Sequence, residues 1–184
     1  GRATAYRTRQ HRIMMHRLLD ELEMITHGPD VMIGTDGDDG DIAVAMYVSA
    51  GVSGSGPDRL ESILSDVAGF DLRRVCATDV RTEALEQFDV VIFPGGSGSK
   101  QARSLQPEGR EAVREFVSSG GGYMGICAGA YLASRGYDWS LGIIDAIVID
   151  RAHWKRGTGT VQVQWNSDGR RSLDHERLDQ SIYY

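Results

Sequence analysis

Residues 120–134 read GGGYMGICAGAYLAS, where an apolar run gives way to a helix-forming one. Within this stretch, GICAG has the G-x-nucleophile-x-G pattern of a nucleophile elbow, with Gly125, Cys127 and Gly129 in the required places. A sharp strand-to-helix turn crowds the backbone, so the residues that flank the nucleophile must lack bulk. The positive end of the following helix would favour the thiolate form of Cys127. The pattern alone also fits a small buried cysteine in a glycine-rich turn.

Strand-like and helix-like segments alternate on both sides of this stretch. Apolar runs predict four strands, at 41–48, 70–80, 88–96 and 122–126, and Cys76 in the second of them is expected to be a small buried residue. Helical patterns occupy 57–68, 107–122 and 128–134, with a polar loop between the third strand and the second helix. Parallel neighbours need a crossover connection. The sequence therefore predicts an α/β fold, a flavodoxin-like doubly wound parallel sheet with helices on both faces.

The last part of the chain no longer alternates between strand-like and helix-like segments. Residues 141–150, LGIIDAIVID, and 160–165, TVQVQW, are strand-like and predict a C-terminal antiparallel extension or hairpin. The chain begins at Gly1 and stops at Tyr184 inside another strand-like segment, SIYY. We expect both ends to be those of a fragment.

The first forty residues differ from the rest in composition. Residues 1–19 contain five arginines and no acid, which fits a targeting peptide, a basic arm or, as the favoured reading, non-native or upstream sequence. Residues 13–25 predict an amphipathic helix, and the Gly- and Asp-rich residues after it predict a flexible linker. The predicted organisation is thus a basic segment with linker, 1–40, and a domain, 41–184, truncated at its C-terminus.

Composition limits the classes of function. The chain has 184 residues and a net charge of -6, which argues against a nucleic-acid partner. No apolar stretch approaches the ~20 residues that would span a bilayer, so a soluble, cytoplasmic protein is expected. Cys76 and Cys127 lack the spacing of a disulfide framework or a zinc site, and no phosphate-binding glycine motif is present. The sequence predicts no metal and no cofactor, and it leaves the oligomeric state open.

Two motifs together carry a family resemblance. VVIFPGGSGS at 90–99, followed by the elbow stretch, resembles the class I glutamine amidotransferase-like superfamily, and most closely the N-terminal domain of some biotin-protein ligases. The resemblance covers about Asp41 to Tyr184. It implies that Cys127 attacks an amide carbonyl to form a thioester, and that the backbone amides of Gly96 and Ala128 form the oxyanion hole.

The sequence departs from relatives in that superfamily at three points. PfpI-type peptidases and chaperones usually carry His where Ala128 stands, and an acid in the loop after the first strand, where SAGVSGSGP has none. Amidotransferases complete a triad with a late His-x-Glu motif, because the thiol needs a base and the base an orienting carboxylate. His153 is a candidate base, whereas His175 is expected to be solvated. We otherwise expect the motif beyond Tyr184.

The leading hypothesis is a cysteine-dependent amide hydrolase or acyl-transfer domain that acts on a small-molecule amide of unknown identity. The alternative is a catalytically silent binding or regulatory domain that keeps the fold and the elbow, and a PfpI-type peptidase or chaperone is a third reading. A histidine and a carboxylate within reach of Cys127 would separate the enzyme from the binding domain.

Overall fold

The computed structural model describes residues 41–82, 84–149, 151, 160–163 and 180–183, and its centre is a parallel sheet. The four strands are β1 (Ile42–Tyr47), β2 (Phe70–Val75), β3 (Val90–Phe93) and β4 (Gly122–Gly125). They lie in the order β2-β1-β3-β4, and every neighbouring pair is parallel. The two central strands are almost wholly buried, as expected for a sheet covered on both faces.

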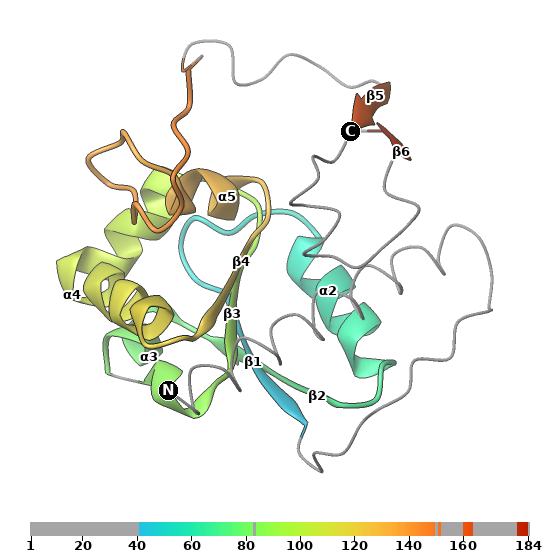
Figure 1. Ribbon diagram of the computed structural model, residues 1–184. Coiled ribbons are helices and arrows are strands. Elements are labelled where there is room, and N and C mark those ends of the chain that lie inside the picture. The colour runs from blue at the N-terminus through green and yellow to red at the C-terminus, as the bar shows by residue number, and fades with distance from the viewer. Residues whose placement is uncertain (1–40, 83, 150, 152–159, 164–179, 184) are drawn as a thin grey trace.

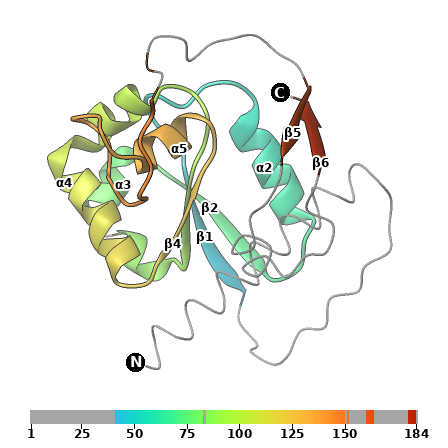
Figure 2. The same ribbon diagram turned by 45° about the horizontal axis from the view of Figure 1, so that its top comes forward.

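Helices cover both faces of this sheet (Figures 1 and 2). One face carries α2 (Gly56–Ser65), and the other carries α3 (Ala77–Arg81), α4 (Gly98–Ser118) and α5 (Ala128–Ala133). A short 3-10 helix, η1 (Ala84–Gln87), leads into β3. The parallel sheet with helices between its strands confirms the predicted α/β, doubly wound fold.

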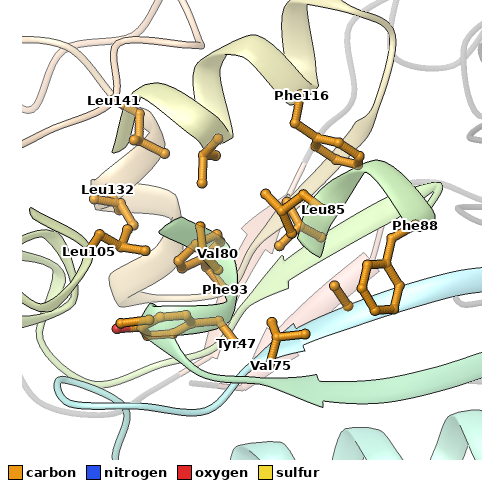
Figure 3. Close-up of a cluster of buried hydrophobic side chains, with 14 of the residues drawn as sticks. Tyr47, Val75, Val80, Leu85, Phe88, Phe93, Leu105, Phe116, Leu132 and Leu141 are labelled. Carbon is orange, nitrogen blue, oxygen red and sulfur yellow. The ribbon is translucent and has the colours of Figure 1, made fainter. Parts of the chain in front are cut away.

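The core divides into two clusters because successive side chains of a strand point to opposite faces. Ala45 and Tyr47 of β1 face α3, α4 and α5, in the larger cluster drawn in Figure 3. Val44 and Met46 of the same strand face α2, where Leu64 packs on them. One strand thus supplies both halves of the core.

The strand order places a topological switch between β1 and β3. From β1 the chain first runs outward to β2 and then returns to β3 on the other side of β1. The connections that follow β1 and β3 therefore leave the sheet in opposite directions, and in such sheets ligands bind beyond the carboxyl ends of the strands at this point. Here residues 48–55 and 94–97 lie at that edge, next to the turn that follows β4.

The polar segment after β3 is helical, which corrects the predicted loop. α4 begins at Gly98 instead of Pro107, and Gln106, with φ 61° and ψ 176°, interrupts it. Proline has no N–H and disfavours the helical conformation in the residue before it, so the break falls at Gln106. The part before the break buries Gln101, Ala102 and Leu105.

The predicted second strand is also too long. β2 ends at Val75, and Cys76 is the N-cap of α3 instead of a buried strand residue. The N–H of Cys76 donates to the Asp79 carboxylate at 2.7 Å, and this hydrogen bond is the main reason why the pKa of Asp79 is lowered. Cys76 is partly exposed.

The C-terminal elements differ in part from expectation. Residues 141–149 form no strand. Within the described residues they make one isolated β-bridge, between Arg135 and Ile147. Arg114 of α4 holds the start of this segment, because its Nε donates to the Leu141 carbonyl at 2.9 Å. β5 (Thr160–Val163) and β6 (Gln180–Tyr183) pair antiparallel, so the predicted extension exists but does not include residues 141–149. The predicted helix at 13–25 lies outside the described residues.

Candidate functional site at the turn after strand β4

Cys127 lies in the turn that joins β4 to α5. The pairing of β4 with β3 continues one residue past the strand, since the N–H of Ile126 donates to the Phe93 carbonyl at 3.0 Å. The Cys127 carbonyl already accepts from the N–H groups of Ala130 and Tyr131, so the helix begins at once. Cys127 absorbs the change of direction with φ 52° and ψ -103°, a conformation that non-glycine residues rarely adopt. Its side chain is exposed.

The two glycines of the elbow have no room for a side chain. A Cβ on Gly125 would lie 2.6 Å from the Gly129 carbonyl, and a Cβ on Gly129 would overlap the carbonyl oxygen of Phe93. Both obstacles are backbone atoms, which cannot rotate aside. Glycine at these positions therefore lets α5 start directly above β3.

The turn after β3, residues 94–97, lies beside the cysteine. A Cβ on Gly95 would be 3.5 Å from Cys127 Cβ and 3.9 Å from Sγ. The turn is also joined to the loop after β1 by two backbone hydrogen bonds: the N–H of Ser53 donates to the Gly95 carbonyl at 3.2 Å, and that of Ser97 donates to the Gly51 carbonyl at 2.7 Å. The turn after β3 thus contacts both Cys127 and the loop after β1, which brings three segments distant in sequence together at this edge of the sheet.

The hydrogen bond from Ser53 also fixes the direction of the Gly96 N–H. The Gly95 carbonyl and the Gly96 N–H belong to one trans peptide group, so they point in opposite directions. Because the carbonyl faces Ser53, the Gly96 N–H faces away from the loop after β1. Within the described residues, neither Gly96 nor Ala128 donates any of the backbone hydrogen bonds found outside regular helices and strands.

Tyr123 of β4 holds α5 from below. Its hydroxyl donates to the Gly129 carbonyl at 2.8 Å, and its ring stacks on Phe93 at 5.4 Å between centroids. Burial raises the pKa of Tyr123, because the phenolate would lose its solvation. The neutral hydroxyl is thus the form that the fold stabilises.

Tyr123 is expected to make stability depend on pH in the alkaline range. A phenol ionises near pH 10 in the unfolded chain, and its folded pKa is higher, so its contribution is complete below about pH 10 and is lost as the pH rises further. Tyr123→Phe should lower the free energy of unfolding by about 1 kcal/mol at neutral pH, and should make its decline from about pH 10 upward shallower. Urea unfolding at neutral pH and at increasing pH above about 10 measures both effects. Equal slopes in the two proteins would contradict this role.

An aromatic pair that sequence reasoning missed borders the same region. Trp139 stacks on Tyr137 at 4.5 Å, and the guanidinium of Arg151 lies 4.6 Å above the Tyr137 ring. A Cβ on Gly98 would lie 3.0 Å from both the Trp139 ring and the Ala128 carbonyl, so the indole packs where α4 begins and α5 starts. The two aromatic residues of the YDW triplet that follows α5 are the feature of the sequence that could have indicated this pair.

The described residues do not include a candidate base. His153 and His175 lie outside them, as do the other three histidines, so the structure does not place a histidine relative to Cys127. Among the described residues there is no group of three His, Cys, Asp or Glu side chains that could hold a metal ion. No helix within them is long and apolar enough to cross a membrane.

Comparison with known families agrees with this architecture. The family model of the N-terminal domain of biotin-protein ligase matches residues 42–156, which is more than half of the chain. The chain therefore belongs to the biotin-protein ligase N-terminal family. The comparison with curated proteins finds no significant relative.

Proposed function

We propose that this domain transfers or hydrolyses acyl groups with Cys127 as nucleophile, and that the backbone N–H groups of Gly96 and Ala128 stabilise the oxyanion. The observation that carries the proposal is the conformation of Cys127: an exposed cysteine with φ 52° in a turn whose flanking glycines admit no side chain. Strained backbone of this kind is concentrated at functional sites. A cysteine with only a packing role would have no need of exposure.

The proposed reaction begins when the Cys127 thiolate attacks the carbonyl carbon of an amide. An S–C bond forms, the carbonyl electron pair moves to oxygen, and the two amides donate to the resulting oxyanion. Collapse of this intermediate breaks the C–N bond, and the amine leaves with a proton from a general acid. Water then hydrolyses the thioester and regenerates the thiol.

An activated ester tests the first half of this chemistry alone. With p-nitrophenyl acetate the S–C bond forms, the C–O bond breaks and p-nitrophenolate leaves without needing a proton, so the reaction does not depend on a general acid. We expect mass spectrometry after brief exposure to find the acetyl group on Cys127, with partly exposed Cys76 as the internal control.

Iodoacetamide supplies the complementary measurement, since it alkylates an accessible thiol by displacement of iodide and forms no oxyanion. Alkylation of Cys127 without acetylation would contradict the proposal and favour a binding or regulatory domain that has kept only the fold. Preferential acetylation of Cys76 would also contradict it.

A further inference from the structure

Gln101 is a buried polar side chain directly beneath the turn after β3. It lies in the first part of α4 and is completely shielded from solvent. Its Nε2 donates to the Pro94 carbonyl at 2.8 Å. Its backbone also meets the loop after β1, because a Cβ on Gly51 would overlap the Gln101 nitrogen and lie 2.9 Å from Cγ. Gln101 therefore contacts both the turn beside the cysteine and the loop after β1.

Burial of this amide is not explained by packing. The Oε1 atom of Gln101 is buried and has no hydrogen-bond partner among the described residues, and a buried oxygen without a partner costs about 1–3 kcal/mol. A leucine would fill similar space in the same cluster of apolar residues without that cost. The hydrogen bond to Pro94 is what an apolar side chain could not supply.

The turn that receives this bond has little stiffness of its own. Gly95 and Gly96 follow Pro94 directly, and glycine is the residue with the greatest backbone freedom. Successive carbonyls of the turn are held by Gln101 at Pro94 and by Ser53 at Gly95. The first bond fixes the peptide group before Gly95 and the second fixes the one after it. Together they determine where the Gly96 N–H points.

We infer that Gln101 is a positioning residue for the oxyanion hole, acting through the Pro94 carbonyl on the Gly96 N–H. This inference rests on the proposed function, because it assigns Gln101 a role in the same acyl-transfer step. Gln101 touches neither the substrate nor the thiol in this role. Its loss should slow the step in which negative charge develops on oxygen and leave other reactions of the thiol unchanged.

The experiment compares two reagents on Gln101→Leu, which keeps the bulk and removes the donor. Acetylation of Cys127 by p-nitrophenyl acetate should fall by about 10 to 100-fold, less than or comparable with the loss of one complete oxyanion donor. Alkylation by iodoacetamide should keep the wild-type rate. Gln101→Met, equally without a donor but more adaptable in shape, is the second variant if the leucine protein does not fold. Lys100→Ala, at the exposed neighbouring position, should leave both rates unchanged.

Each other outcome overturns the inference. Unchanged acetylation in folded Gln101→Leu or Gln101→Met would show that the Pro94 bond does not position the hole. Acetylation and alkylation that fall together would show a general structural role. Failure of the proposed function is separately visible, because wild-type Cys127 would then be alkylated but not acetylated, and the role of Gln101 would fall with it.

Discussion

Gly96→Ala is expected to slow acetylation of Cys127 by about 100 to 1,000-fold while the thiol remains open to iodoacetamide. Gly96 has φ 138°, which L side chains rarely adopt, and an added Cβ would overlap the Gly51 carbonyl and lie 2.9 Å from the Ser53 nitrogen. The turn must move away from the loop after β1, and the Gly96 N–H moves with it. Stopped-flow release of p-nitrophenolate measures the effect.

Gly54→Ala is the matched control for that variant. Gly54 lies in the loop after β1 and also has a positive φ, of 81°, but nothing lies within 4 Å of an added Cβ. Backbone strain is therefore common to both variants, whereas the collision occurs only at Gly96. Wild-type acetylation by a folded Gly96→Ala protein would remove Gly96 from the oxyanion hole.

Gly129→Ala should have the largest effect on folding. The added methyl group would overlap the Phe93 carbonyl, which is part of a central strand, so neither partner can give way without separating α5 from the sheet. We expect the free energy of unfolding to fall by about 3 kcal/mol or more. That is a large share of the roughly 5–15 kcal/mol that stabilises a typical domain.

Urea unfolding of Gly129→Ala can be compared with that of Gly56→Ala. Gly56 opens α2 with no atom within 4 Å of a new Cβ, so its replacement should change stability by no more than about 0.5 kcal/mol. A Gly129→Ala protein as stable as Gly56→Ala would mean that the elbow is not packed as described.

Local sequence patterns were sufficient for the parallel sheet. The central strands β1 and β3 are short apolar runs that are almost wholly buried, and the helices after β1 and β4 begin where proline or small residues permit. The turn around Cys127 could also be predicted, because the turn itself requires glycine two residues before and two residues after the cysteine. Boundaries were less secure. The start of α4 carries Gly, Ser and Lys, which indicate a loop, yet packing of Ala102 and Leu105 on the core makes it helical.

Contacts between distant segments could not be predicted in this way. The bridge from Val52 to Gly96 forms because the loop after β1 reaches across the edge of the sheet. The sequence of neither segment indicates that the two will pair. The same holds for Trp139 against Gly98 and for Gln101 against Pro94. The apolar run at 141–149 shows the opposite error: it has the composition of a strand but forms no ladder with any described segment, and it leaves Ile147 and Ile149 exposed.

The loop after β1 is joined to the turn after β3 through backbone groups alone, and this makes it a region that can be re-engineered. The N–H groups of Ser53 and Ser97 make the two connections, while the side chains of Ser53 and Ser55 are exposed and take no part in them. Proline is excluded at 53 and 97 because it has no N–H to donate. Most other residues at 53 and 55 would leave the geometry beside Cys127 intact, so these two positions can be varied without rebuilding the elbow.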